Sequence, residues 1–267
     1  MIEETPAVVA HNLSLTGDEG PVFGPLDCTI PSGGLTNLTG AGGSGRTALA
    51  LVLAGRMKPT EGELTVLGEA RRSNIQKRVA VAGIDQIDFL ERSVKVRDVL
   101  NENKSWARPW FKFFRPATEE DLRYYCEDLY GPRDLPPLDS YVSQLPSLDK
   151  LLLRVALALK PAHGHEIDML IMDDLEQVHS FTDREFLLHT LDRLAERMTV
   201  VVNSVNPIDD CVQPRAVIEL NTNQGHFVPD NTGKSDDWDP YEPTPADENR
   251  SPQDDAMARK VASEGRE

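Results

Sequence analysis

Short apolar segments bounded by glycine, proline and asparagine dominate the amino-terminal part of the chain. Such segments predict β-strands, and they fall at residues 7–10, 27–30, 35–38, 62–66 and 79–82. One helix is expected to interrupt them, from about Thr47 to Arg56, because Leu49, Val52 and Leu53 share one face. The sequence up to about residue 87 is therefore predicted to be rich in strands.

The apolar pattern changes after residue 88, where helical spacing predominates as far as about residue 160. The helices expected there span 96–103, 119–130 (capped by Thr118) and 148–159. A strand at 169–172, a helix at 183–197 and strands at 199–203 and 216–220 follow. Apolar strands that alternate with helices favour a mostly parallel sheet covered on both faces, so an α/β fold is predicted.

Composition divides the chain at about residue 228. Residues 229–267 are acidic and rich in proline, serine and asparagine, which is typical of a disordered tail, and residues 1–228 form the expected domain. The formal net charge of −16 argues against nucleic acid as a partner. No long uncharged apolar run, no signal-peptide pattern and only three widely spaced cysteines are present, so a cytoplasmic protein is expected.

A glycine-rich segment follows the strand predicted at 35–38 and opens the first helix. Glycines allow consecutive backbone N–H groups to surround a phosphate, and the helix N-terminus adds partial positive charge. Arg46 stands where a lysine is usual, and its planar guanidinium is bulkier than an ammonium. A glycine-rich turn capped by Ser44 is the alternative. The residues expected to hold phosphate are Gly40, Gly42, Gly43, Ser44, Gly45, Arg46 and Thr47.

The order of several segments resembles the nucleotide-binding domain of ATP-binding-cassette (ABC) transporters over about residues 5–228. Residues 53–63 match the segment after the family's first helix, Gln86 falls at its Q-loop glutamine, and residues 143–159 resemble its signature region. Residues 169–174 resemble the Walker B strand. The resemblance implies an ABC-type P-loop NTPase fold, with a mostly parallel core sheet, an antiparallel β subdomain and a helical subdomain at about 88–160.

The resemblance also implies ligands and roles. ATP and Mg²⁺ would bind here, with Thr47, Gln86 and Asp173 at the metal and Asp174 and Gln86 at catalytic positions. Asp173 would lie at the tip of a strand next to that of the phosphate loop, and a carboxylate and a hydroxyl are ligands that Mg²⁺ accepts. A strand-end carboxylate that caps the next turn is the alternative for Asp173.

Other positions depart from the family pattern. Asp174 is one methylene shorter than the usual catalytic glutamate, and Val205 replaces the switch histidine. Thr16 stands where the family has an aromatic residue that stacks on adenine. Residues 145–149 read Leu-Pro-Ser-Leu-Asp instead of the signature Leu-Ser-Gly-Gly-Gln. These departures imply an ATP-binding subunit of a membrane transporter in which hydrolysis is weak or lost.

Two kinds of protein partner follow from the resemblance: an integral membrane transporter subunit and a second nucleotide-binding domain, in a homo- or heterodimer. The protein would then be peripheral to the inner face of the membrane. Residues 106–115 hold five aromatic residues, and residues 104–115 hold four basic residues and no acidic one. Aromatic and basic residues together favour a docking surface for the membrane subunit, and a core element of the helical subdomain is the alternative.

Two further functions are compatible with the sequence. A pseudo-ATPase that acts as a scaffold or regulatory module would keep the fold without nucleotide turnover. A P-loop enzyme of another family, such as a kinase, would need a phosphoacceptor base and a lid, and the sequence indicates neither.

Overall fold

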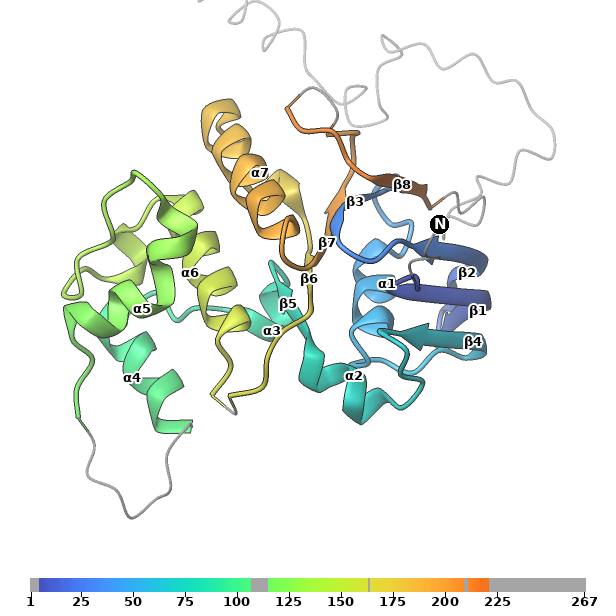
Figure 1. Ribbon diagram of the computed structural model, residues 1–267, viewed down its shortest axis with the longest axis horizontal. Coiled ribbons are helices and arrows are strands. Elements are labelled where there is room, and N and C mark those ends of the chain that lie inside the picture. Colours follow the sequence, from blue (N-terminus) through green and yellow to red (C-terminus); the bar gives the residue numbers. More distant parts are fainter. Residues whose placement is uncertain (1–4, 107–114, 163, 209–210, 221–267) are drawn as a thin grey trace, which may run out of the picture. The chain divides into compact units, whose positions relative to one another are not determined.

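Two β-sheets and the helices packed on them form the described part of the chain in this computed structural model (Figure 1). The structure describes residues 5–106, 115–162, 164–208 and 211–220. The tail predicted at 229–267 and most of the aromatic and basic segment, residues 107–114, lie outside the described residues. None of the described helices is long and apolar enough to cross a bilayer.

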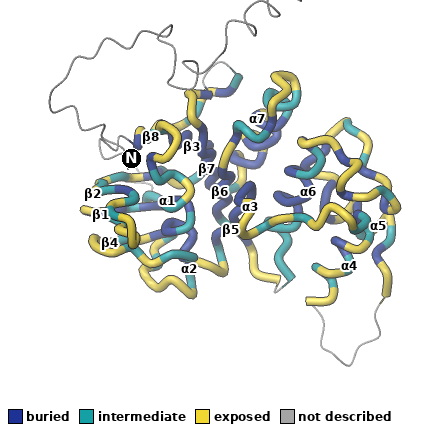
Figure 2. Tube along the Cα trace, turned by 180° about the vertical axis from the view of Figure 1, so that it is seen from behind, coloured by how far each residue is buried: buried dark blue, intermediate teal, exposed yellow. Residues whose placement is uncertain are grey.

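The larger sheet is parallel in all of its described pairings. Its strands β6 and β7 are buried along their whole length (Figure 2). Because the carboxyl ends of parallel strands lie at one edge, the residues that follow them are brought together there. The order across the sheet is β5 (Val79–Ala82), β6 (Met169–Met172), β7 (Thr199–Ser204), β3 (Gly34–Thr39) and β8 (Ala216–Glu219).

Helices cover one face of this sheet, and a helix with the smaller sheet covers the other. Val200 and Val202 of β7 belong to a hydrophobic core shared with four helices, whereas Val201 belongs to a second core. Alternate residues of a strand point to opposite faces, which explains the division. The four helices of the first core are α4 (Val96–Trp106), α5 (Glu119–Tyr130), α6 (Ser147–Leu159) and α7 (Phe181–Ala195).

The smaller sheet is antiparallel and packs over α1 (Arg46–Leu53). Its central strand pairs with both neighbours, so that Val8 lies opposite Ile30 on one side and Val66 on the other. Leu13 and Phe23 of this sheet share the second core with Leu49 of α1. The strand order is β2 (Gly20–Ile30), β1 (Val8–Gly17) and β4 (Glu61–Val66).

Most predicted elements are present, and β5, β6 and α5 have the predicted bounds. Thr118 caps α5 as expected: its hydroxyl accepts from the Asp121 N–H, and the Asp121 carboxylate accepts from the Thr118 N–H at 2.8 Å. This reciprocal arrangement satisfies two N–H groups that the helix cannot use. Strong apolar runs and a capping box are therefore the signals that located these elements correctly.

The prediction of a single helix before residue 87 is wrong. α2 (Arg72–Arg78) precedes β5, and the short α3 (Asp85–Asp88) follows it. Ile75 is the buried residue of α2, so no apolar stripe marks this helix in the sequence. Polar contacts hold it instead, because the side chains of Arg72 and Gln76 donate to the Gly55 carbonyl at 3.0 and 2.6 Å.

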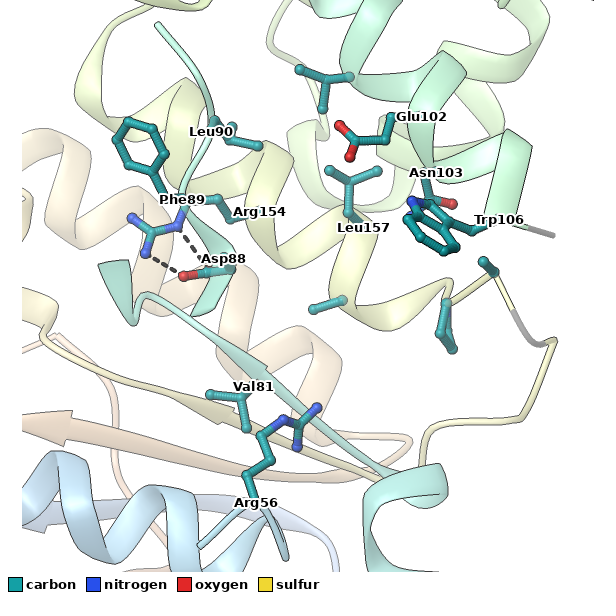
Figure 3. Close-up of a pocket in the computed structure, with 14 residues that line it drawn as sticks. Arg56, Val81, Asp88, Phe89, Leu90, Glu102, Asn103, Trp106, Arg154 and Leu157 are labelled. Carbon is teal, nitrogen blue, oxygen red and sulfur yellow. Dashed lines mark hydrogen bonds and ion pairs between the residues drawn. The ribbon is translucent and has the colours of Figure 1, made fainter. Parts of the chain in front are cut away.

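A buried ion pair connects α6 to α3 (Figure 3). The side chain of Arg154 is 8% exposed and donates to both carboxylate oxygens of Asp88, at 2.8 and 2.5 Å. It also donates to Gln177 at 3.0 Å and lies 3.1 Å from Asp85. Burial lowers the pKa of Arg154, but the hydrogen bonds and charges of Asp88 and Asp85 outweigh burial and raise it. Arg154 is therefore a fixed cation that joins α6 to α3 and to the short helix Leu175–Gln177.

Replacement of Arg154 by alanine should destabilise the protein by up to about 3 kcal/mol, because the Asp88 carboxylate, which is 15% exposed, would lose its cation. Urea denaturation followed by circular dichroism measures this free energy. Arg197→Ala is the matched control, since its pair with Asp128 is more than half exposed on both sides and should contribute less than about 1 kcal/mol. Equal small effects of the two substitutions would contradict the role given to Arg154.

Candidate functional site

The glycine-rich segment forms a tight loop between β3 and α1. A backbone hydrogen bond from the Ser44 N–H to the Ala41 carbonyl closes the loop at 3.1 Å. Gly45 has φ of 85°, and a Cβ there would lie 2.5 Å from the Val22 carbonyl oxygen. A Cβ on Gly40 would lie 2.6 Å from the Ser44 hydroxyl. Glycine is therefore required sterically at both ends of the loop.

The loop carries buried polar atoms without a protein partner. The Ser44 hydroxyl and two guanidinium nitrogens of Arg46, Nε and Nη1, have no hydrogen-bond partner in the structure. Buried polar groups are normally paired, so each such group needs an explanation. A helix N-terminus with unpaired donors is suited to an anion, and these atoms fit a phosphate group.

Asp173 brings the loop together with the edge of the parallel sheet. Its carboxylate is 4% exposed and follows β6 directly. One oxygen accepts from the Thr47 hydroxyl at 2.6 Å, and the other accepts from the Asn203 side-chain amide at 2.6 Å. The predicted proximity of Thr47 and Asp173 is thus present in the structure. The expectation that Asp173 belongs to the strand next to that of the loop is wrong, because β7 lies between β6 and β3.

A pocket of about 430 Å³ opens beside these residues and contains the other predicted positions. Gln86 reaches it from α3, and Asp174 reaches it from the end of β6. Gly83 also lines it: with φ of 90°, a Cβ there would lie 2.2 Å from the Asp173 carbonyl. The complete lining is Arg46, Thr47, Gly83, Ile84, Asp85, Gln86, Asp173 and Asp174.

Asp174 is exposed and has an unusual backbone conformation. Its φ of 54° and ψ of 69° lie in the left-handed region, which only aspartate, asparagine and histidine visit with some frequency among non-glycine residues. Partial burial of its carboxyl, followed by the charges of Glu176 and Asp173, raises the pKa of Asp174, and Arg46 opposes this shift. Asp174 therefore lies close to two other carboxylates, those of Asp173 and Glu176, and to one cation, Arg46.

Two contacts at this edge were not expected from the sequence. Asn203 at the end of β7 holds Asp173, and the Glu176 carboxylate accepts from the Val205 N–H at 2.7 Å. The sequence does carry one signal for Asn203, since it is an amide that directly follows three valines near the carboxyl end of a strand. No pattern in the sequence indicates the Glu176 contact, because its partner Val205 is 29 residues away in an irregular segment.

Comparison with known proteins shows similarity to one family over part of the chain. Residues 23–131 match the ABC transporter family model. This part of the chain is therefore similar to ABC transporter proteins, and the chain spans less than half of the length of the curated relatives that it matches. The Probable multidrug ABC transporter ATP-binding protein YbhF of Escherichia coli is 48% identical over 52 residues, which are 20% of this chain and 9% of that protein. The cytochrome c biogenesis ATP-binding export protein CcmA of Xanthomonas axonopodis is 35% identical over 79 residues, 29% of this chain and 37% of that protein.

Solved structures show the same ABC fold at low sequence identity. The ATP-binding cassette MJ0796, in a dimeric post-hydrolysis state with ADP and Pi, superposes with a TM-score of 0.62 at 17% identity. That match covers 79% of this chain and 93% of the other. CbiO1 of Clostridium perfringens, part of the ABC transporter complex cbiONQ, gives 0.58 at 16% identity, with 76% and 80% covered. The predicted ABC-type ATPase fold is confirmed.

Residues 145–149, predicted to correspond to the ABC signature, are partly buried in the protein. α6 begins at Ser147, and Leu148 is fully buried in the core shared with the other helices. The Asp149 carboxylate lies 3.4 Å from the Arg133 guanidinium, and burial of its carboxyl raises the pKa of Asp149. Leu148 and Asp149, two of the residues predicted to replace the signature, therefore make contacts within this chain.

Replacement of Asp174 by asparagine should raise the melting temperature at neutral pH by about 1–2 °C. Asparagine tolerates the left-handed backbone and removes one charge from the acidic group. Differential scanning fluorimetry at low and high salt measures the change, which should shrink as salt screens the repulsion. Asp18→Asn, in the exposed hairpin turn between β1 and β2, should have no effect. A lower melting temperature for Asp174→Asn would contradict charge repulsion at this position.

Proposed function

We propose that the chain is the ATP-binding subunit of a membrane ABC transporter and that it binds Mg-ATP at the loop of residues 40–47. The observation that carries the proposal is the hydrogen bond of 2.6 Å between Thr47 and Asp173, beside the unpaired buried donors of Ser44 and Arg46. Donors for phosphate and oxygen ligands for Mg²⁺ thus meet at one helix N-terminus.

The residues of the pocket divide between the two ligands. Backbone N–H groups of the loop, with the Ser44 hydroxyl and the Arg46 guanidinium, would hold the phosphates. Thr47, Asp173 and Gln86 would hold Mg²⁺, which neutralises phosphate charge when it is bound. A planar guanidinium can form two parallel hydrogen bonds to phosphate oxygens, so Arg46 can serve as the phosphate-binding cation.

Hydrolysis by this subunit is proposed to be weak or lost. Asp174 carries a shorter side chain than the family glutamate, and a displacement of about 1 Å from the reacting atoms can lower a rate about a hundredfold. Val205 has no side-chain donor to replace the switch histidine, and Leu148 is buried where the family has a signature glycine. These features support a site that binds nucleotide and turns it over slowly.

Two partners complete the proposal. A second nucleotide-binding domain would pair with this chain, as in the dimeric cassette to which the chain is similar. An integral membrane subunit would dock at a groove of about 370 Å³ beside α4 and α6 (Figure 3). Trp106 and Phe89 line this groove and are 73% and 60% exposed. Exposed aromatic residues beside a pocket are frequent anchors of protein interfaces.

Titration with fluorescent mant-ATP in the presence of Mg²⁺ tests nucleotide binding. Arg46→Ala should weaken binding about 10–100-fold, since hydrogen bonds to charged groups contribute about 1.5–3 kcal/mol. Arg46→Lys should recover much of the affinity, because it restores a cation at the loop. Arg71→Ala, an exposed arginine outside the site, should bind like the wild type.

The outcome also separates the alternatives. Absence of wild-type binding at millimolar nucleotide would refute the proposal and favour a scaffold that does not use nucleotide. ATP turnover at a rate usual for the family, by the purified protein alone or with its partner, would refute weak hydrolysis and leave ATP binding intact.

Replacement of Phe89 and Trp106 by serine should release the protein from the membrane fraction of its native cells without unfolding it, because both side chains are exposed. Cell fractionation and a melting curve of the purified variant measure the two effects. Val217→Ser is the control, since Val217 is 57% exposed on β8. A variant that unfolds would instead indicate a packing role for the two aromatic residues.

A further inference from the structure

Asn203 is a buried amide in a strand that is otherwise mostly apolar. Its side chain is 1% exposed, and it lies beside Leu38 of β3 in the parallel register. On the other side of β7, Val202 pairs with Met172, the last residue of β6. Asn203 follows Val202 in β7. It therefore lies between the end of β3, where the phosphate loop begins, and Asp173 after β6.

The contacts of Asn203 join these two features. Its Nδ2 donates to Asp173 Oδ1 at 2.6 Å and to the Arg46 carbonyl at 3.2 Å. Both partners are acceptors, which fixes the amide with its nitrogen toward them. Its own oxygen Oδ1 is buried without a hydrogen-bond partner. The Asn203 side chain therefore leaves its oxygen without a hydrogen bond. Its nitrogen holds the Asp173 carboxylate and the Arg46 carbonyl in the first turn of α1.

We infer that Asn203 is a positioning residue for Mg²⁺, which holds the Asp173 carboxylate in place beside Thr47. The inference deepens the proposed function and rests on it. Asp173 has two oxygens, and Asn203 restrains one while Thr47 contacts the other at 2.6 Å. Carboxylates that bind metals are commonly oriented by such hydrogen bonds, and their loss lowers metal affinity about 10–100-fold.

The adjacent residue separates this role from ordinary packing. Ser204 is also buried in β7, but its hydroxyl contacts the Asn37 side chain at 3.0–3.1 Å and the Asn206 carbonyl at 2.6 Å. None of these described contacts involves the loop or Asp173. Ser204→Ala therefore removes buried hydrogen bonds from the same strand and leaves the carboxylate restrained.

The experiment measures how nucleotide binding depends on Mg²⁺. Mant-ATP is titrated into the full chain in EDTA, and MgCl₂ is then titrated into the complex. Asn203→Ala should raise the Mg²⁺ concentration at the midpoint about 10–100-fold and leave the affinity in EDTA unchanged. Asn203→Val, whose branched side chain suits a buried strand, should behave in the same way and serves if the alanine variant does not fold. Ser204→Ala should keep the wild-type midpoint.

Four other results of these titrations would contradict the inference or the proposed function. A wild-type midpoint in both Asn203 variants would refute the inference while the proposed function stands. An equal loss of affinity in EDTA would show that Asn203 supports the phosphate loop through the Arg46 carbonyl and does not position the metal. A shift of the same size in Ser204→Ala would reduce the effect to strand packing. Absence of any wild-type binding would refute the proposed function, and the inference with it.

Discussion

The buried carboxylate of Asp173 is the constraint on which the rest of the site depends. A charged group that is 4% exposed is costly unless donors surround it. Thr47 supplies one donor from α1, and Asn203 supplies another from β7. These bonds hold the end of β6 and the start of α1 on either side of β7, so three segments distant in sequence keep one relative position. The loop of residues 40–47 is thereby fixed against the carboxyl edge of the parallel sheet.

On the proposed function, the charges at this edge make nucleotide binding depend on a metal. Asp85, Asp173 and Asp174 line the same pocket, and Arg46 is the cation among its lining residues. A polyphosphate that enters alone meets three carboxylates and one guanidinium, so repulsion offsets part of the attraction of the loop amides. A divalent cation reverses this balance, because it converts the nearby carboxylates from repulsive neighbours into ligands.

The sequence predicted those parts of the molecule that depend on local pattern. Strand β6 and helix α5 were predicted with their bounds, because an apolar run and a capping box mark them. Thr47 and Asp173 were also predicted together, since loop and strand tip occur in a recognisable order. By contrast, the Arg154–Asp88 pair joins residues 66 positions apart, and the Asn203–Asp173 pair joins residues 30 apart. Such contacts depend on strand order and helix packing, which hydrophobic periodicity does not specify.

Three of the positions that depart from the family pattern make contacts within the chain. Leu148 is packed into the helical core, Asp149 pairs with Arg133, and the N–H of Val205 is bound by Glu176. On the proposed function, these three positions are engaged inside the chain and are not directed toward a phosphate. The phosphate loop retains buried donors that have no partner within the protein. On the proposed function, a bound nucleotide would supply the partners that the loop lacks. Arg154 connects α6 to this side of the molecule, because it contacts Asp88 and also Asp85, which lines the pocket.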